Sequence, residues 1–327
     1  MPIEAKAVCF PKADTAELVD VRYQDPTPGQ MVVRINASGI SAGTEGSIFR
    51  GTRTHNGTFP LITGYQGAGV VEWAGAEVKG YAVGDRVVVT SVASKLIEPE
   101  LAIVWGTHSS RVVVEPRNID PIPEGVDDDD ASLCTVWAVG LHGPTVAGIK
   151  STDTVLVVGL GLIGLSFVQC VVAMGAEVVG LDLSEERAGI CRALGAEAFT
   201  TPEQVRAWLD ARGLTGFSVA AEATGHAEVI DVPLQFAARE AGVVWQGWYP
   251  GRVDFEYHQA HAKQLTFYFP TGSGGHQPRM LRLIAQGLFN AADLISHCFA
   301  VEDCQDAYDL AVLHAGQSLG VVLEWPQ

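Results

Sequence analysis

The sequence predicts an α/β protein with two domains, a β-rich first domain and a doubly wound domain of parallel strands. The chain has 327 residues, which is long for a single domain. Short β-branched runs fill its first third, and strand and helix patterns alternate from Thr154 onward. An apolar fraction of 47% with 36 glycines is typical of a compact folded protein.

The first third reads as short strands separated by turns. Apolar or β-branched runs at 31–35, 69–72 and 86–89 are bounded by turn residues such as Pro28-Gly29 and Gly84-Asp85. Short strands at this spacing predict a barrel-like domain. A helix is expected over 131–148, after an aspartate run and ending at a glycine.

The second part alternates between strands and helices, which predicts a parallel sheet with helices on both faces. The expected strands are 155–158, 177–181, 217–221, 242–246 and 265–269, and the clearest helices are 185–194, 202–211 and 277–286. A last apolar run at 320–324 is expected to be a strand that returns to the first domain.

Charge and hydropathy exclude two classes of partner. A formal net charge of −17 repels phosphate backbones and anionic membranes, so neither nucleic acid nor a membrane surface is expected as a partner. The stretch 154–183 is apolar enough for a membrane span, but five glycines and Glu177 interrupt it. A buried strand–helix–strand unit explains both features.

The six cysteines form no CxxC pair, and several lie in apolar stretches. This pattern indicates buried thiols in a reducing compartment. The first residues, MPIEAKAVCF, lack the basic and long apolar segments of a signal peptide. We therefore expect a cytoplasmic protein.

A glycine motif follows the first strand of the alternating part. Gly159, Gly161 and Gly164 form GxGxxG, and Leu162 and Ile163 lie between the last two glycines. The first glycine permits a tight turn, the second lets a pyrophosphate approach the backbone, and the third allows close helix packing. The free N–H groups of the next helix attract the phosphates. An ordinary strand-to-helix turn is the alternative interpretation.

An acidic residue ends the next strand. Asp182 lies 18 residues beyond Gly164, close to the separation expected for an acid that binds the adenosine ribose. Such a carboxylate repels a 2′-phosphate, so we expect NAD rather than NADP. The alternative role for Asp182 is a helix cap. Arg187 is a further candidate near the adenosine, or a solvated helix residue.

Two more segments follow later strands of the expected sheet. Ala223-Thr224-Gly225 comes after one strand, and Gly247-Trp248 comes after the next. Ligands of open parallel sheets bind outside the carboxyl ends of strands, so both segments are expected to contact the nicotinamide half. Ordinary turns are the alternative interpretation.

These motifs, taken in order, resemble the medium-chain dehydrogenase/reductase superfamily. The resemblance rests on Ala37-Ser38-Gly39-Ile40, Gly64-Tyr65-Gln66-Gly67-Ala68-Gly69, Val83-Gly84-Asp85-Arg86-Val87, the glycine turn and Glu222-Ala223-Thr224-Gly225. It implies a GroES-like β-barrel catalytic domain, discontinuous over 1–135 and 273–327, and a doubly wound Rossmann domain over 136–272. It also implies hydride transfer in a cleft between the domains, and a homodimer or homotetramer.

The sequence departs from the zinc-dependent members of this superfamily. Ser41 stands where they carry a cysteine, Tyr65-Gln66 replaces His-Glu, and Thr135 falls at the third ligand position. Zinc prefers thiolate, imidazole or carboxylate ligands. The stretch 90–106, which corresponds to the structural-zinc lobe, contains no cysteine. We therefore expect a zinc-independent enzyme without a bound metal.

Without zinc, side chains must handle the substrate proton. The candidates are Tyr65, a hydroxyl relay through Ser41 and Thr44, and Glu45 as a carboxylate base. The alternative for Tyr65 is a wall residue that fills the space of the metal. The residues expected to line the substrate cleft are Gln66, His108, Trp105 and Thr135.

The sequence thus predicts a zinc-independent, NAD(H)-dependent enzyme that interconverts a secondary alcohol and a ketone. We expect a small hydroxylated substrate from a biosynthetic pathway. Two alternatives stay open. One is an enoyl or quinone reductase that uses NAD(P)H, and the other is a nucleotide-binding protein without catalysis.

Overall fold

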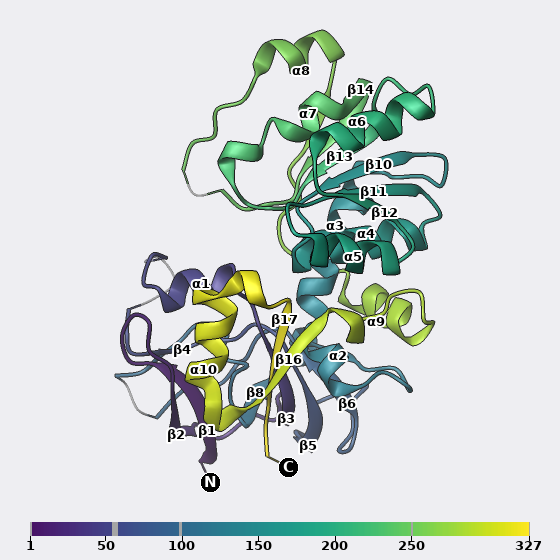
Figure 1. Cartoon of the computed structure of the whole chain (residues 1–327). Coiled ribbons are helices and arrows are strands. Elements are labelled where there is room, and N and C mark those ends of the chain that lie inside the picture. The colour runs from purple at the N-terminus through teal and green to yellow at the C-terminus, as the bar shows by residue number, and fades with distance from the viewer. Residues whose placement is uncertain (1, 54–57, 98–99, 250, 327) are drawn as a thin grey trace. The chain divides into compact units, whose positions relative to one another are not determined.

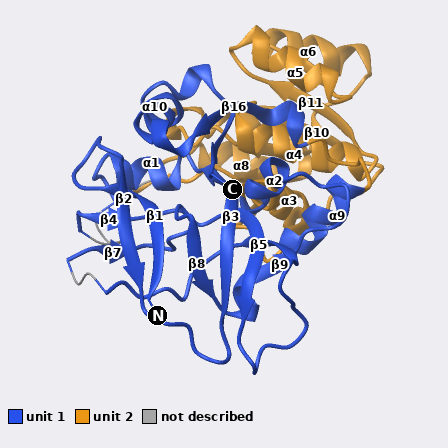
Figure 2. Cartoon of the chain, turned by 90° about the horizontal axis from the view of Figure 1, so that it is seen from below, with its two compact units in different colours: residues 1–135, 277–285, 291–327 blue, residues 136–276, 286–290 orange. Residues whose placement is uncertain are grey.

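The computed structural model describes residues 2–53, 58–97, 100–249 and 251–326, and these divide into two units. Unit 1 comprises 1–135, 277–285 and 291–327, and unit 2 comprises 136–276 and 286–290 (Figure 2). The chain passes from unit 1 to unit 2 after 135 and returns to unit 1 at 277, and 286–290 pack with unit 2.

Two sheets organise the described part of unit 1. The first has the order β2-β1-β4-β7, and the second has the order β16-β17-β3-β5-β6-β9 with β8 paired to β3. Their strands are β1 (Ile3–Phe10), β2 (Glu17–Tyr23), β3 (Met31–Ile40), β4 (Leu61–Ile62), β5 (Gly67–Ala74), β6 (Arg86–Val89), β7 (Ala102–Ile103), β8 (Arg111–Val114), β9 (Ile119–Pro121), β16 (Ile295–Ala300) and β17 (Gly320–Glu324).

The prediction that the last strand returns to the first domain is confirmed. Strand β17 pairs antiparallel with β3, with Val321 opposite Ile40 and Glu324 opposite Ala37. Its inward residues join a core that includes Val33, Ile35, Phe49 and Tyr308. The short helices α1 (Thr44–Phe49) and α10 (Cys304–Tyr308) contribute to this core.

Unit 2 contains a parallel sheet of the doubly wound type, as predicted. Its order is β12-β11-β10-β13-β14-β15, and all of its pairs are parallel. Figure 1 shows α4 and α5 on one face of this sheet and α6 and α7 on the other. The strands are β10 (Thr154–Val158), β11 (Glu177–Leu181), β12 (Glu197–Phe199), β13 (Phe217–Glu222), β14 (Ala237–Trp245) and β15 (Thr266–Tyr268).

The helices of unit 2 follow from local signals. Helix α6 (Pro202–Ala211) begins at a capping box in which Thr201 accepts a hydrogen bond from the Gln204 N–H, and proline occupies its first turn. Its apolar face packs on the sheet through Trp208 and Leu209. The remaining helices are α3 (Cys134–Ala147), α4 (Leu162–Ala173), α5 (Glu185–Ala193), α7 (Val232–Phe236) and α8 (Tyr257–Lys263).

The helix expected over 131–148 is broken in two. Helix α2 (Asp128–Ser132) ends at Leu133, whose ψ of 11° leaves the helical region, and α3 begins at Cys134. The predicted stop is present, because Gly148 has a φ of +67° that a side chain disfavours. The helix predicted in the tail is α9 (Gln277–Ala285).

The apolar stretch at 154–183 forms β10, α4 and β11, as predicted. Among the described helices, none has the length and apolarity that a membrane span requires. Five of the cysteines are buried and Cys298 is exposed, and all six are free thiols.

The centre of the parallel sheet should dominate the stability of unit 2. Leu156 on β10 is completely buried, whereas Leu183 is 92% exposed. We predict that Leu156→Ala lowers the free energy of unfolding by about 2–5 kcal/mol because it leaves a cavity. The matched change Leu183→Ala should alter it by less than about 0.5 kcal/mol. Urea unfolding followed by tryptophan fluorescence measures both, and equal effects would contradict this description of the core.

Candidate functional site

The glycine turn of unit 2 is built from backbone packed against backbone. Gly159 has a φ of +90°, and a Cβ atom there would lie 2.5 Å from Thr224 Cγ2. A Cβ atom on Gly164 would lie 1.8 Å from the Gly159 carbonyl oxygen. Both positions therefore require glycine, which agrees with the roles predicted for the first and third residues of the motif.

The second glycine leaves open space at the start of α4. A Cβ atom on Gly161 would meet one atom within 4 Å, Nη1 of Arg187 at 3.9 Å. Gly161 is the N-cap of α4, and no side chain caps this helix. The first N–H groups of a helix lack intrahelical partners, so the turn that includes Leu162 and Ile163 can receive an anion. The Arg187 guanidinium adds a positive charge beside it.

Asp182 is joined to the same turn. Its Oδ2 accepts a hydrogen bond of 2.7 Å from the Leu160 N–H, and its Oδ1 accepts one of 2.9 Å from the Ser184 N–H. Ser184, not Asp182, caps helix α5, because the Ser184 side chain accepts from the Arg187 N–H. The carboxylate is partly exposed and lies at the carboxyl end of β11, where a ribose hydroxyl can reach its remaining lone pairs.

A buried acid organises the loop after β13. Glu222 is fully buried, and its Oε1 accepts a 2.6 Å hydrogen bond from the Thr224 N–H, while Oε2 accepts a 3.4 Å bond from the Gly225 N–H. The Thr224 hydroxyl also donates to Oε1. Burial raises the pKa of Glu222, and the hydrogen bonds from Thr224 and Gly225 oppose this shift. The carboxylate fixes the predicted Ala223-Thr224-Gly225 segment.

The segment after β14 lies against this loop. A Cβ atom on Gly247 would lie 2.7 Å from Glu222 Oε2 and 2.7 Å from the Gly225 backbone. Trp248 is 63% exposed and its carbonyl oxygen faces Gly225. Because the Ala223 N–H also donates to the Val158 carbonyl, the ends of β10, β13 and β14 meet at one edge of the sheet. The structure thus brings the three predicted cofactor segments together.

Unit 1 carries the residues predicted to handle the proton. The Tyr65 hydroxyl donates a 2.7 Å hydrogen bond to Ser41 Oγ. The Thr44 side chain also forms a hydrogen bond with the Tyr65 hydroxyl. Ser41 directly follows β3, and Thr44 is the first residue of α1. Tyr65 is partly exposed by surface area, while Ser41 is buried. The expected cluster of hydroxyl groups is therefore present.

The surroundings of Tyr65 favour its neutral form. Burial raises the pKa of the Tyr65 hydroxyl well above its ordinary value, and the negative charge of Glu45 raises it further. The hydrogen bonds that Tyr65 forms with Ser41 and Thr44, and the positive charge of Arg53, lower the pKa and so act in the opposite direction. A phenol in this environment keeps its proton through neutral pH and is suited to donate a hydrogen bond.

The side chains at the zinc-ligand positions of the family do not suit zinc. Ser41 and Tyr65 bind each other, the buried Gln66 amide donates 3.3 Å to the Gly39 carbonyl, and Thr135 is partly exposed near the start of α3. A hydroxyl, a phenol and an amide are poor ligands for a cation that prefers thiolate, imidazole or carboxylate. The donor set at this place therefore does not fit a catalytic zinc ion.

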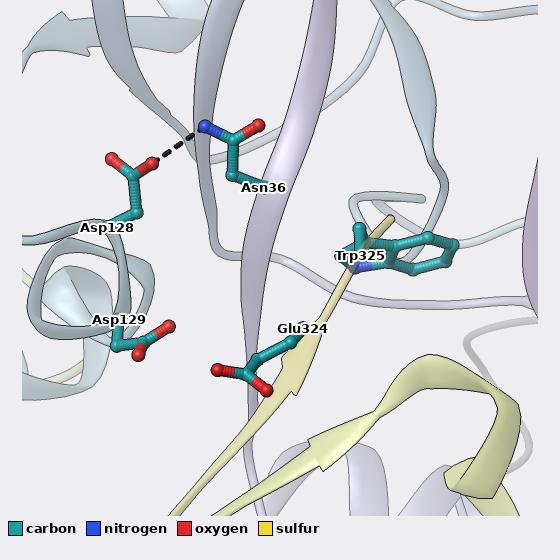
Figure 3. A pocket seen from close by; sticks show the side chains of 5 residues that line it. All are labelled: Asn36, Asp128, Asp129, Glu324 and Trp325. Carbon is teal, nitrogen blue, oxygen red and sulfur yellow. Dashed lines mark hydrogen bonds between the residues drawn. The ribbon is translucent and has the colours of Figure 1, made fainter. Parts of the chain in front are cut away.

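Three other ligand-type side chains do approach one another in unit 1. Within the described residues, Asp129, Cys298 and Glu324 place ligand atoms within 4.8 Å of one another. Figure 3 shows Asp129 and Glu324 lining a pocket with Asp128, whose carboxylate accepts a hydrogen bond from Asn36. The group contains none of the residues that the sequence suggested for catalysis.

Glu45 and His108 lie deeper than the sequence suggested. Both side chains are completely buried, and His108 Nε2 lies 2.8 Å from Glu45 Oε2. His108 was expected to line a substrate cleft, and Glu45 was expected to act as a base. Trp105 is partly exposed, and its indole packs edge-on against the Tyr65 ring with 5.6 Å between centroids. Trp105 therefore belongs to the surroundings of Tyr65.

Among the described residues, His142, His258 and His261 take no part in the contacts given above. His142 is partly buried on α3, and its ring packs 5.3 Å from that of His276. His258 and His261 are both exposed on α8. His55 falls outside the described residues.

Sequence reasoning did not assign roles to Glu222, Ser38 and Tyr308. The Tyr308 hydroxyl donates a 2.8 Å hydrogen bond to Glu45 Oε2, and Ser38 Oγ lies 2.8 Å from His108 Nδ1. Glu222 had one available signal, since an acid at the end of an apolar strand needs N–H partners when it is buried. Tyr308 is 263 residues from Glu45, so no local signal reveals that contact.

Comparison with known proteins finds a matching protein family for each of two segments of the chain. Residues 27–124 match the alcohol dehydrogenase GroES-like domain, and residues 163–286 match the zinc-binding dehydrogenase family. L-threonine 3-dehydrogenase of Anaeromyxobacter sp. (strain Fw109-5) is 27% identical, over 96% of this chain and 98% of the relative. The 2-desacetyl-2-hydroxyethyl bacteriochlorophyllide A dehydrogenase of Cereibacter sphaeroides is 27% identical, over 94% of each chain.

The fold agrees with a solved structure as well. An alcohol dehydrogenase, RspB from E. coli CFT073, complexed with NADH, superimposes with a TM-score of 0.85 over 98% of this chain and 99% of that chain, at 22% identity. The first unit is thus a GroES-like β domain and the second a Rossmann domain. By its motifs, its two domains and its relatives, the chain belongs to the medium-chain dehydrogenase/reductase superfamily of nicotinamide-dependent oxidoreductases.

Proposed function

We propose that this protein interconverts a secondary alcohol and a ketone with NAD(H), without zinc, and with Tyr65 as the proton donor and acceptor. The observation that carries the proposal is the hydrogen bond between Tyr65 and Ser41 at positions where zinc-dependent members hold metal ligands. The relatives that are dehydrogenases of threonine and of a hydroxyethyl pigment support oxidation of an alcohol carbon.

The cofactor would rest on the glycine turn of unit 2. Gly161 and the first N–H groups of α4 would hold the pyrophosphate, and Asp182 would accept hydrogen bonds from the adenosine ribose. The loops that Glu222 fixes, 223–225 and 247–248, would face the nicotinamide half. Bound NADH supplies the hydride, and the chain's own residues position the cofactor and move the proton.

Tyr65 would act on the substrate oxygen. In reduction, its hydroxyl donates a proton as negative charge develops on the carbonyl oxygen, and the phenolate that is left regains a proton from water; oxidation is the reverse and requires the phenolate to accept the proton of the alcohol. Ser41 and Thr44 hold the phenol in one orientation by hydrogen bonds. Trp105 limits the motion of the ring by packing against its edge. Tyr65 would thereby supply the proton to the substrate oxygen without a metal, because its phenol stays protonated at neutral pH.

The hydroxyl of Tyr65 provides the test of the proposal. We predict that Tyr65→Phe lowers kcat for ketone reduction by about 10²–10⁴-fold, as expected when a general acid is lost. The control Tyr81→Phe removes the phenol that donates to the Ile119 carbonyl in the same unit and should leave kcat unchanged. A panel of ketones, alcohols and enones identifies a working substrate, and turnover of enones alone would replace this proposal with an enoyl reductase.

The pH dependence has a definite sign. Because burial and the Glu45 charge raise the pKa of Tyr65, its hydroxyl stays protonated well above neutral pH. We predict that the reduction rate shows no loss attributable to a tyrosine below about pH 10, the ordinary pKa of that group. A pH–rate profile measures this. A decline centred near pH 7–8 that disappears in Tyr65→Phe would contradict the environment described.

Cofactor preference tests the role of Asp182. We predict that NADH binds at least about tenfold more tightly than NADPH, and that Asp182→Ser reduces this preference by about tenfold, or 1.4 kcal/mol. Fluorescence titration gives both dissociation constants. Because Asp182 also holds the Leu160 N–H, the ratio of the two constants is the informative quantity. Asp210→Ser, an exposed acid of the same unit, is the control.

Metal analysis tests the absence of zinc. We predict less than about 0.1 zinc ion per chain by mass spectrometry, and unchanged activity after dialysis against a chelator, because Ser41, Tyr65 and Gln66 are poor zinc ligands. One tightly held zinc ion whose removal abolishes turnover would overturn the zinc-free mechanism but not the NAD(H) proposal.

A further inference from the structure

A chain of buried, hydrogen-bonded polar groups runs through Glu45 and His108. Glu45 Oε2 accepts a 2.8 Å hydrogen bond from the Tyr308 hydroxyl and lies 2.8 Å from His108 Nε2. On the other side of the ring, His108 Nδ1 lies 2.8 Å from Ser38 Oγ, which accepts a 2.9 Å hydrogen bond from Trp325 Nε1. Both ring nitrogens of His108 are thereby fixed.

The strap 63–66, which carries Tyr65, rests on this imidazole. A Cβ atom on Gly64 would lie 2.7 Å from His108 Cγ and Cδ2, and Gly64 has a φ of +102°. The backbone N–H of His108 donates to the Thr63 carbonyl, and the backbone N–H of Thr107 donates to the Gly64 carbonyl. The residue before Tyr65 therefore has direct contact with the ring that Glu45 and Ser38 hold.

Glu45 also reaches Tyr65 from the helix side. The Glu45 N–H donates 3.0 Å to the carbonyl of Ser41, the residue whose hydroxyl accepts from Tyr65. The negative charge of Glu45 favours the protonated phenol, and Arg53 is the charge that opposes it. One oxygen of Glu45, Oε1, is buried without a hydrogen-bond partner among the described residues. Such a buried oxygen costs the free energy of its lost hydration.

We propose that Glu45 and His108 are positioning residues, which together fix the strap that carries Tyr65 and the orientation of its hydroxyl. This assigns Glu45 a role other than that of a base, because its carboxylate is completely buried and bonded to His108 and Tyr308. The inference rests on the proposed function for the significance of Tyr65, but the geometry it describes can be measured without a substrate.

The experiment uses the full chain with 3-fluorotyrosine incorporated only at Tyr65, followed by fluorine NMR from pH 6 to 10.5. Glu45→Gln keeps the shape of the side chain and removes its charge. We expect the fluorine resonance of Tyr65 to move from its wild-type position throughout this range, because the contacts that hold the strap change. The control Glu72→Gln breaks a surface ion pair with Arg34 and Arg111 in the same unit and should leave the spectrum unchanged.

Spectra of folded Glu45→Gln that superimpose on those of the wild type over the whole range would overturn the proposal. Should Glu45→Gln not fold, Ser38→Ala decides the matter, because it removes one hydrogen bond from the His108 ring and leaves the charge in place. A broadened or displaced fluorine line supports positioning through His108, and an unchanged line refutes it. Full activity of Tyr65→Phe would refute the proposed function while these spectra stand.

Discussion

The carbonyl oxygen of Gly159 lies 1.8 Å from the place where a Cβ atom of residue 164 would be, so the turn requires glycine at position 164. The same constraint recurs at Gly247 against Glu222, and in unit 1 at Gly64 against His108. At each of these places the backbone approaches a neighbour more closely than a side chain permits. The remaining functional groups are arranged around these close approaches.

Two buried carboxylates hold the loops that these glycines make possible. Glu222 accepts two N–H groups of its own loop, whereas Glu45 bonds to side chains from distant parts of unit 1. Burying a carboxylate is expensive unless hydrogen bonds compensate for lost hydration. Both oxygens of Glu222 accept hydrogen bonds, and Oε2 of Glu45 is bonded to His108 and Tyr308, so hydrogen bonds offset the cost of burying each carboxylate.

Local patterns were sufficient to predict most of the fold. The glycine motif after β10, the helical pattern of α6 and the apolar run of β17 each depend on neighbours in sequence, and each element is present. The break between α2 and α3 was not predicted, because it depends on the backbone of a single residue, Leu133. The candidate cofactor residues were placed together because parallel strands end at one edge.

Contacts between distant residues limited prediction of the proton-handling site. The Tyr65–Ser41 pair spans 24 residues and followed from the family resemblance, but Glu45 and His108 are 63 residues apart. Nothing in either local sequence indicates that their side chains meet in the core. Both were therefore expected near the substrate, where charged and imidazole side chains are common, and the structure shows them buried behind Tyr65.

The most direct test is a crystal structure of the protein with NADH and a bound alcohol or ketone, with data collected at the zinc absorption edge. The account predicts that the substrate oxygen lies about 2.6–3.2 Å from the Tyr65 hydroxyl, with no anomalous density beside it. A zinc ion bound to the substrate oxygen, or a Tyr65 hydroxyl turned away from it, would contradict the account.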